Sequence, residues 1–366
     1  MQRLNVGIIG VGLAFERLHY PAFMQLEDRY KLMALCDVDQ EKTRHWADKL
    51  QLNYEFDTYT DWQEMLNRDD LDVIDIMVPI ELNYRITEAV AKRASGKRMG
   101  IIAEKPLAPT MEQAKAARDL AKKYNIPIMI AENYRYNEEM NIIRDLVRNK
   151  HVGDILYFIQ NSIDDFPSKM IKDTFQAKEW RQHPDYPGGS LTDSALHDIA
   201  GLRHIFGAIE KLQAFGRPQK ADYSPYSVVN VNLLFKNGIT GQFTFFSAGK
   251  EMQRPLTGLR IFGTQGMIYL EEKSAGTINI AHNDGHSEQL PYKPEAGYYN
   301  EILNFYKALT GKEPISVTPE MEYGDLETIN DIITSIQEEK IINVDDKFSY
   351  QPSYHEPKSQ GVHELH

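Results

Sequence analysis

The sequence predicts an α/β protein of two domains, in which a doubly wound parallel sheet is followed by a mostly antiparallel sheet. Two features predict this fold class. In the first third of the chain, short apolar runs alternate with helical stretches, the pattern of βαβ units. After residue 151, strand-like runs follow one another with few helices between them. The length of 366 residues also favours two domains, at roughly 150 residues per domain.

Five apolar runs mark the parallel strands of the first domain, predicted over residues 1–133. The runs are nearly continuous rather than alternating, as expected for strands that helices cover on both faces. Asp39 is placed to cap the helix that carries Trp46. The five runs are residues 4–9, 32–36, 73–78, 101–103 and 126–130.

The second domain, predicted over residues 134–342, contains half-buried strands. Val229, Val231 and Leu233 alternate with Val228, Asn230 and Asn232, which is the period of a half-buried strand. Asn237-Gly238 is a strong hairpin signal. The predicted strands are Ile155–Ser162, Ser227–Phe235, Ile239–Phe246, Leu259–Phe262 and Met267–Glu271, and the predicted helices are Leu191–Phe206, Tyr298–Leu309 and Tyr323–Glu338. Residues 343–366 are polar with little periodicity, which predicts a tail.

Composition and charge exclude several classes of protein. The 41 Lys+Arg and 53 Asp+Glu give a net charge of −12, which argues against a nucleic-acid partner. No uncharged apolar run reaches the ~18 residues of a membrane helix, and the N-terminus lacks the apolar core of a signal peptide. The single cysteine, Cys36, cannot form an internal disulfide, which fits a reducing compartment. We therefore expect a cytoplasmic protein.

The segment Gly10-Val11-Gly12 ends the first strand and opens a helix through Leu13 and Ala14. There the first glycine permits a tight turn, and the second lets the backbone approach a pyrophosphate at the helix N-terminus. The third small position of this pattern falls on Phe15, so helix and strand must pack differently here. Taken alone, the two glycines are equally compatible with a purely structural turn.

Asp37 strengthens the case for a dinucleotide site. It ends the second strand, where a carboxylate can accept hydrogen bonds from an adenosine ribose. The same carboxylate repels a 2′-phosphate, which favours NAD over NADP. The alternative role for Asp37 is to cap the next helix, although Asp39 is better placed for that role.

Two further segments carry groups suited to acid–base chemistry. Glu104-Lys105-Pro106 follows a parallel strand, at the sheet edge where ligands bind, and a lysine there can hold positive charge beside a reacting oxygen. Asp193 and His197 lie four residues apart and share one helix face, and histidine is suited to general base work. The ordinary alternatives are a solvated lysine and a surface ion pair.

His204 extends the stripe of Asp193 and His197 and raises the question of a metal site. Three ligands from one helix cannot surround an ion, and the sequence shows no further Cys or His cluster to complete the set. We therefore expect no metal centre. His355, His363 and His366 lie in the predicted tail and could bind metal loosely, but a solvated tail or an arm on a neighbouring subunit is favoured.

The order of these motifs resembles the Gfo/Idh/MocA oxidoreductases over residues 4–340. The most specific part of the resemblance is Glu-Lys-Pro at residues 104–106 combined with Gly188-Gly189, Asp193 and His197. It implies an N-terminal Rossmann domain, a C-terminal α+β domain with an open sheet, and NAD(P)-dependent oxidation or reduction of sugars, cyclitols or their derivatives. Asn83 departs from the family, in which many members have histidine, and substrate identity does not transfer.

The resemblance implies a role for each motif residue. By position, Lys105 corresponds to the lysine near the reacting hydroxyl and the nicotinamide, Asp193 to the substrate-orienting acid, and His197 to the general acid/base. Pro79 matches the proline beside the cofactor. The predicted catalytic residues are thus Lys105, Asp193 and His197, and the predicted cofactor-binding residues are Gly10, Gly12, Leu13, Ala14, Asp37, Pro79, Glu104 and Lys105.

These residues predict reversible hydride transfer between NAD and a carbinol carbon of a sugar, cyclitol or related polyol. Tyr136, Trp180 and Arg181 are candidate walls of the substrate pocket, although Trp180 could equally belong to the core. Two alternatives are a non-catalytic NAD-binding sensor and a redox-neutral enzyme with tightly held NAD. A homodimer or homotetramer is expected to form through the second sheet, whose exposed face needs a cover.

Overall fold

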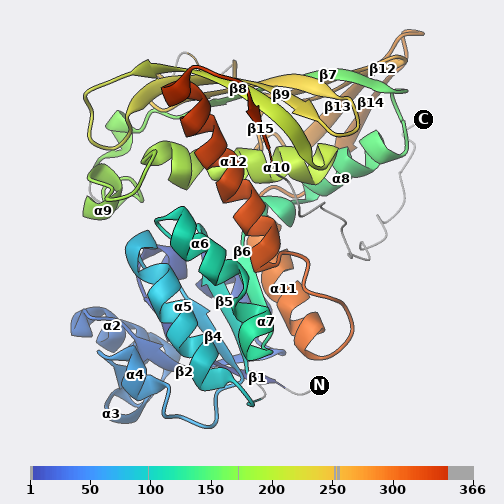
Figure 1. Ribbon diagram of the computed structural model, residues 1–366. Coiled ribbons are helices and arrows are strands. Elements are labelled where there is room, and N and C mark those ends of the chain that lie inside the picture. Colours follow the sequence, from blue (N-terminus) through green and yellow to red (C-terminus); the bar gives the residue numbers. More distant parts are fainter. Residues whose placement is uncertain (1–2, 98, 172, 251–252, 254–255, 345–366) are drawn as a thin grey trace.

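A computed structural model describes residues 3–344, apart from residues 98, 172, 251–252 and 254–255. The chain forms two sheets with helices packed against both, one sheet in each half of the molecule (Figure 1). This confirms the predicted fold class. None of the helices in the described ranges combines the length and apolar character that crossing a bilayer requires.

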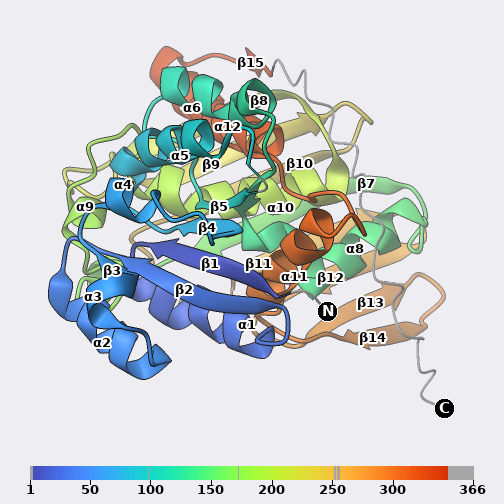
Figure 2. The same ribbon diagram turned by 90° about the horizontal axis from the view of Figure 1, so that it is seen from below.

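The first sheet is parallel and has six strands in the order β3-β2-β1-β4-β5-β6. Its strands are nearly all buried, because helices cover both faces (Figure 2). The strands are β1 (Leu4–Ile9), β2 (Tyr30–Cys36), β3 (Thr58–Tyr59), β4 (Val73–Ile76), β5 (Gly100–Glu104) and β6 (Ile128–Ala131). The helical segments are η1 (Phe15–His19), α1 (Tyr20–Gln25), α2 (Gln40–Leu50), α3 (Tyr54–Asp57), α4 (Trp62–Met65), α5 (Ile80–Ala94), α6 (Met111–Arg118) and α7 (Leu120–Tyr124).

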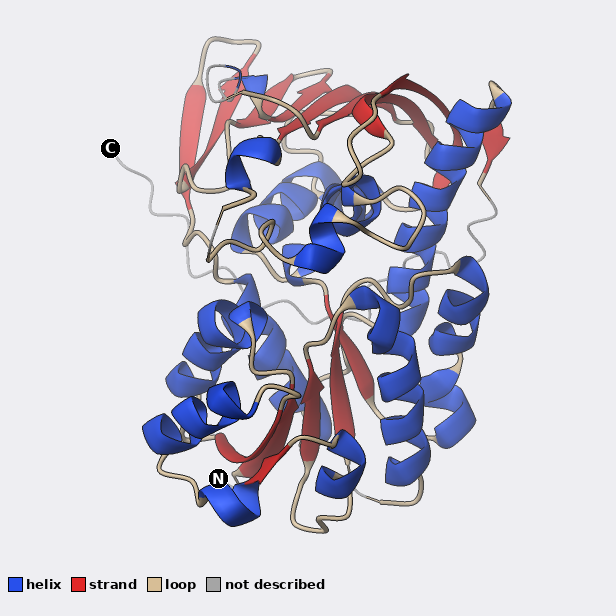
Figure 3. Cartoon of the chain, turned by 90° about the vertical axis from the view of Figure 1, so that its left-hand side faces the viewer, coloured by secondary structure: helices blue, strands red, loops and turns tan. Residues whose placement is uncertain are grey.

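The strand order of this sheet reverses between β1 and β4, which lie side by side. At such a switch point the loops leave the sheet in opposite directions and open a crevice at the carboxyl ends of the strands. Those ends face the helices of the second domain (Figure 3). The sheet topology therefore fixes where a ligand site can form.

The second sheet has nine strands in the order β14-β13-β12-β11-β7-β10-β9-β8-β15. All neighbouring pairs are antiparallel except β7 and β10. The strands are β7 (Ile155–Ile163), β8 (Ile209–Pro218), β9 (Tyr226–Phe235), β10 (Thr240–Phe246), β11 (Gly258–Gly263), β12 (Gly266–Leu270), β13 (Thr277–His282), β14 (Ser287–Pro291) and β15 (Ile342–Asn343). The predicted alternation is confirmed: Val229, Val231 and Leu233 are buried on one face.

Helices cover one face of this sheet and lie between it and the first domain (Figure 1). They include α8 (Glu138–Arg148), α10 (Leu196–Phe206) and α12 (Pro319–Glu338), together with the shorter η2 (Asn133–Arg135), η3 (Pro167–Lys169), α9 (Glu179–Gln182) and η4 (Leu191–Ala195). Helix α11 (Gly297–Leu309) packs beside β6, and Val317 accepts a hydrogen bond from the backbone of Ile130. The segment from α11 to α12 thus contacts both domains.

The predicted tail begins too early. Asn343 lies in β15, which pairs with β8 at the edge of the second sheet, and Val344 is buried. A strand of two residues is too short to show alternation in the sequence. Residues 345–366, including His355, His363 and His366, lie outside the described residues.

Candidate active site

A cleft with a volume of about 650 Å³ runs between the two domains. It starts at the carboxyl ends of β1, β2 and β4 and reaches η4 and α10 of the second domain. Twelve of the thirteen predicted site residues line it. These are Gly10, Gly12, Leu13, Ala14, Asp37, Pro79, Glu104, Lys105, Trp180, Arg181, Asp193 and His197.

The glycine turn has the geometry that the sequence predicts. Gly10 has a φ of +95°, and a Cβ atom there would lie 2.1 Å from the carbonyl oxygen of Met77, the residue that follows β4. A Cβ atom on Gly12 would meet nothing within 4 Å. The first glycine is therefore required by the turn, whereas the second leaves open space beside the helix start, where a pyrophosphate can approach.

Asp37, which follows β2, stabilises the glycine turn through hydrogen bonds. Its carboxylate accepts hydrogen bonds from the backbone of Val11 at 3.0 Å and of Asp39 at 3.0 Å. Asp39, as predicted, caps α2 through Glu41. Asp37 is thus held at the mouth of the cleft, and each carboxylate oxygen keeps further acceptor capacity for a ribose hydroxyl.

The missing third glycine coincides with a change in helix geometry. The helix that opens at Leu13 takes a π turn over η1, and Phe15 is fully buried there. Its ring packs edge-on against Trp46 with centroids 4.7 Å apart. The wider turn accommodates a phenylalanine where the common pattern has a small residue.

Lys105 reaches across the domain boundary. Its Nζ donates hydrogen bonds to Asp193, at 2.7 Å to the main-chain oxygen and 3.0 Å to Oδ1. The buried amide of Asn83 donates to the carbonyl oxygens of Glu104 and Pro106 and so holds the Glu-Lys-Pro backbone. Asn83, where many family members have histidine, therefore supports the backbone of residues 104–106. It does not line the cleft.

Asp193 lies between two cations. Nε of Arg181 donates to its Oδ2 at 2.6 Å, and Lys105 donates to its Oδ1. Burial alone would raise the pKa of Asp193, but the adjacent Arg181 and Lys105 outweigh burial and place the pKa well below its usual range. Arg181 in turn lies 4.1 Å from the ring centroid of Trp180. Asp193 is therefore a fixed anion that orders Lys105, Arg181 and Trp180 at the cleft.

His197 is held by a residue that the sequence reasoning did not assign to the site. Its Nδ1 lies 2.8 Å and 2.9 Å from the two carboxylate oxygens of Glu132, which is fully buried at the end of β6. The ring of Tyr134 stacks on the imidazole with centroids 4.4 Å apart. In the sequence, Glu132 follows the apolar run of residues 126–130, and its place at the same sheet edge as Glu104 is the available signal.

Glu132 remains ionised in this setting. Burial would raise its pKa, but the interaction with His197 and the nearby Lys105 and Arg135 lower the pKa below its usual value. A carboxylate at Nδ1 holds the imidazole in the tautomer that carries the proton on Nδ1. The lone pair of Nε2 is then available for a ligand.

Tyr136 is not part of the cleft. It is buried, and its hydroxyl donates to Oδ1 of Asn304 at 3.1 Å. The sequence could not distinguish the two tyrosines of the Tyr134-Arg135-Tyr136 stretch, of which Tyr134 contacts the site through its stacking on His197.

The stripe of Asp193, His197 and His204 does not form a metal site. Asp193 and His197 are engaged as described, and Nη1 of Arg144 lies 2.8 Å from Nε2 of His204. A different group converges elsewhere: His151, His282 and Glu288 bring one ligand atom each within 4.8 Å of one another. No spacing of these three residues in the sequence indicates the cluster.

Comparison with known families matches both domains. Residues 4–132 match a family described as an oxidoreductase family with an NAD-binding Rossmann fold. Residues 140–269 match a GFO/IDH/MocA C-terminal domain. The open space at Gly12 and the acid at Asp37 fit the dinucleotide that this family binds.

Named relatives cover much of the chain. An uncharacterized protein of Saccharomyces cerevisiae, YMR315W, is 27% identical over 86% of this chain and 89% of its own length. Levoglucosan dehydrogenase of Pseudarthrobacter phenanthrenivorans is 31% identical over 58% of this chain and 54% of its own.

A solved structure of levoglucosan dehydrogenase in complex with NADH and L-sorbose shares the fold. Its TM-score is 0.82 at 22% identity, and the match covers 94% of this chain and 99% of that one. The predicted resemblance and the predicted NAD-binding oxidoreductase are thereby confirmed. The chain belongs to the GFO/IDH/MocA family of NAD-binding oxidoreductases.

Proposed function

We propose that the protein transfers a hydride between NAD and a carbinol carbon of a sugar, cyclitol or related polyol. The observation that carries this proposal is the meeting of Lys105 from the first domain with Asp193 from the second, in the cleft that His197 also lines. NAD, when bound, supplies the hydride acceptor. The protein supplies the groups that manage the hydroxyl proton and the charge on oxygen.

His197 is proposed as the general base in the oxidation direction. Nδ1 is committed to Glu132, and Nε2 makes no hydrogen bond with any residue that the structure describes. A substrate hydroxyl in the cleft can therefore give its proton to Nε2, and the buried carboxylate of Glu132 stabilises the imidazolium that forms. Such positioned acid–base help is worth ~10²–10⁴-fold in rate.

Lys105 is proposed to stabilise negative charge on the reacting oxygen. A lysine ammonium has three N–H donors, and two of them are used on Asp193. The third N–H group can donate to the substrate oxygen. The family resemblance implies that Asp193 orients the substrate. Its contacts favour a different role, in which it fixes Lys105 and Arg181.

The cofactor preference is proposed to be NAD over NADP. Asp37 sits at the cleft mouth, where its negative charge would repel a 2′-phosphate on the ribose. Nζ of Lys42 lies 3.8 Å from Asp37 and 3.4 Å from Asp39. The two carboxylates together outweigh the single positive charge of Lys42.

The substrate class rests on the polar lining and on the family. The cleft has several hydrogen-bond donors and acceptors, which suit a polyhydroxylated ligand. They are supplied by Lys105, Arg181, Asp193 and His197. Relatives named levoglucosan dehydrogenase, D-apiose dehydrogenase and 1,5-anhydro-D-fructose reductase act, by their names, on carbohydrates.

A screen of inositols, hexoses and anhydrosugars with NAD, followed by absorbance at 340 nm, tests the proposal. We expect NADH to form with at least one polyol, and the rate to fall when His197 is replaced by alanine. NAD that binds without any turnover would contradict an enzyme and favour the sensor. Substrate conversion without added NAD or net NADH, by protein that retains NAD through purification, would favour the redox-neutral alternative.

The protein is also proposed to self-associate through the outer face of the second sheet. Large apolar side chains, including Leu156, Tyr157 and Phe215, are exposed on this domain. Tyr157 stacks on Phe262 of the neighbouring strand with centroids 4.4 Å apart, which extends the apolar surface. A second copy of the same sheet would bury it.

A further inference from the structure

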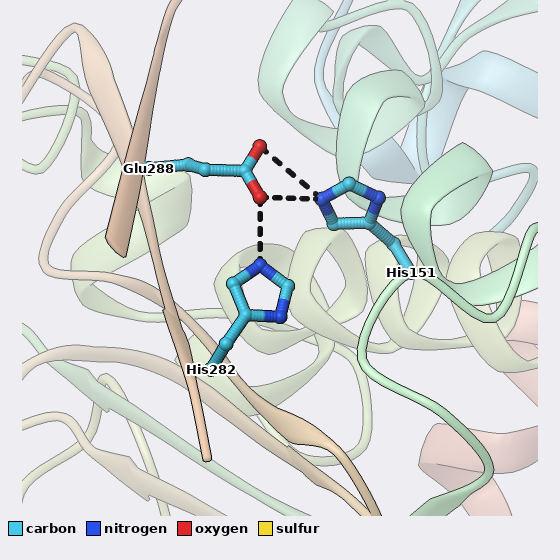
Figure 4. A group of neighbouring side chains, drawn as sticks. All are labelled: His151, His282 and Glu288. Carbon is cyan, nitrogen blue, oxygen red and sulfur yellow. Dashed lines mark hydrogen bonds and ion pairs between the residues drawn. The ribbon is translucent and has the colours of Figure 1, made fainter. Parts of the chain in front are cut away.

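The side chains of His151, His282 and Glu288 converge outside the cleft (Figure 4). Nε2 of His151 lies 3.1 Å and 3.3 Å from the two carboxylate oxygens of Glu288. Nε2 of His282 lies 2.6 Å from Oε1 of the same carboxylate. None of the three residues lines the cleft of the candidate active site.

The fold brings these residues together from two distant segments. Glu288 on β14 pairs with Ile280 on β13, and His282 follows Ile280 by two residues, so both side chains lie on the same face of the sheet. Ile280 is buried, which identifies this face as the one that the helices cover. His151 comes from the loop after α8 and meets the hairpin from that side.

The spacing of the donor atoms is close to that of a tetrahedral metal site. Zinc bonds of ~2.0–2.1 Å at tetrahedral angles place ligand atoms about 3.3 Å apart. The distances to Oε1 of Glu288 are 2.6 Å from His282 and 3.1 Å from His151. Zinc binding would therefore lengthen the first by about 0.7 Å and the second by about 0.2 Å. All three ligand atoms already lie within 4.8 Å of one another.

We propose that His151, His282 and Glu288 bind one zinc ion. Two imidazoles and a carboxylate are a common zinc-binding set, with a fourth position left for water or another donor. His286 is a candidate for that position, because its Nε2 lies 3.9 Å from Oε1 of Glu288. The three side chains are partly buried, so they are restrained yet reachable by an ion from solvent.

The ion would connect the β13–β14 hairpin to the end of α8. β14 is the edge strand of the sheet, and β13 is its one partner among the described strands. A metal bound only by the folded arrangement stabilises that arrangement by mass action. Zinc should therefore strengthen the attachment of this edge and leave the chemistry of the cleft unchanged.

Zinc titration of the full-length protein, in a background that removes His355, His363 and His366, tests the proposal. The background carries alanine at these three positions, so that the C-terminal histidines cannot contribute. We expect one equivalent of zinc to bind and to raise the melting temperature by about 3–6 °C at saturation. Glu288→Gln and His282→Ala should each weaken binding by at least about tenfold. Cobalt in place of zinc should give the visible absorption bands of tetrahedral Co²⁺.

His45→Ala in the same background is the matched control, because His45 is an exposed histidine on α2 in the first domain. It should bind zinc as the parent does. Circular dichroism of each metal-free variant establishes that the fold is retained. A parent that binds no zinc at a large molar excess would overturn the proposal. Equal zinc affinity in Glu288→Gln, His282→Ala and the parent would also overturn it.

Discussion

Nδ1 of His197 lies 2.8 Å from the buried carboxylate of Glu132, so the proposed base of one domain is oriented by the last strand of the other. The contact joins α10 of the second domain to the end of β6 in the first. It fixes the imidazole tautomer and leaves the lone pair of Nε2 available for a ligand. The proposed proton transfer therefore depends on how the two domains pack.

Replacing Glu132 with glutamine should lower kcat by at least ~10²-fold. The amide keeps the size of the side chain but removes the charge that stabilises an imidazolium, and it can offer a donor to Nδ1 in the wrong tautomer. Steady-state kinetics with NAD and the best polyol measure this effect. NAD affinity, followed by fluorescence titration, should stay within a few-fold of the parent. An unchanged kcat would show that Glu132 does not act through His197.

Replacing Lys105 with alanine should also lower kcat by at least ~10²-fold, because the reacting oxygen loses its nearest cation. Lys123→Ala is a suitable control, since Lys123 is an exposed lysine paired with Glu88. It should behave like the parent. Near-parental turnover by Lys105→Ala would remove Lys105 from the mechanism.

Replacing Asp37 with alanine should reduce the preference for NAD over NADP by about tenfold, which corresponds to ~1.4 kcal/mol of lost repulsion. The ratio of kcat/KM for the two cofactors is the measurement. Asp39→Ala, two residues away on the helix cap, serves as the control and should keep the parental ratio. If both variants keep that ratio, Asp37 does not discriminate between the cofactors.

His19 should make stability depend on pH. It is buried between Asp75, 2.8 Å from Nδ1, and Glu104, 3.2 Å from Nε2. Burial alone would lower the pKa of His19, but the two carboxylates raise it well above its usual value. The stabilisation is then complete below the unfolded pKa of about 6.5 and is lost as pH rises through the folded pKa.

Urea unfolding of the parent and His19→Gln from about pH 6 to about pH 9 measures this effect. The advantage of the parent in free energy of unfolding should shrink as pH rises. His45→Gln, an exposed site, should show no such trend relative to the parent. An advantage that stays constant over the range would mean that His19 is not charged in the folded state.

Light scattering at micromolar concentration should give a dimer or tetramer. Phe215→Glu places a charge on the exposed sheet surface and should shift the protein toward the monomer. Phe56→Glu changes an equally exposed phenylalanine of the first domain and should leave the assembly intact. A monomeric parent would contradict the proposed interface.

The sequence predicted those parts of the fold whose patterns are local. The parallel strands appeared as continuous apolar runs, and the turn at Gly10 followed from its residue type. The strand β8 was missed because a bulge near Ile209 breaks its alternation, and β14 because an edge strand with alternate exposed residues reads as a polar loop. Short β3 and β15 give too few residues for any period.

The parts of the site that escaped prediction depend on tertiary contact. Glu132 and His197 are 65 residues apart, and only the packing of α10 against the end of β6 makes them partners. His151 and Glu288 are 137 residues apart and show no spacing that a metal motif would have. The sequence predicts site roles for Lys105, Asp193 and Arg181 separately. It does not predict that Asp193 forms ion pairs with both cations.

We propose that His197 accepts the hydroxyl proton in a cleft where NAD binds independently of it. Steady-state kinetics of His197→Ala with the best polyol test this role, together with NAD affinity and the exposed control His183→Ala. We predict a loss of at least ~10²-fold in kcat for His197→Ala alone, with NAD affinity retained by both variants. A kcat near the parental value in His197→Ala would contradict it.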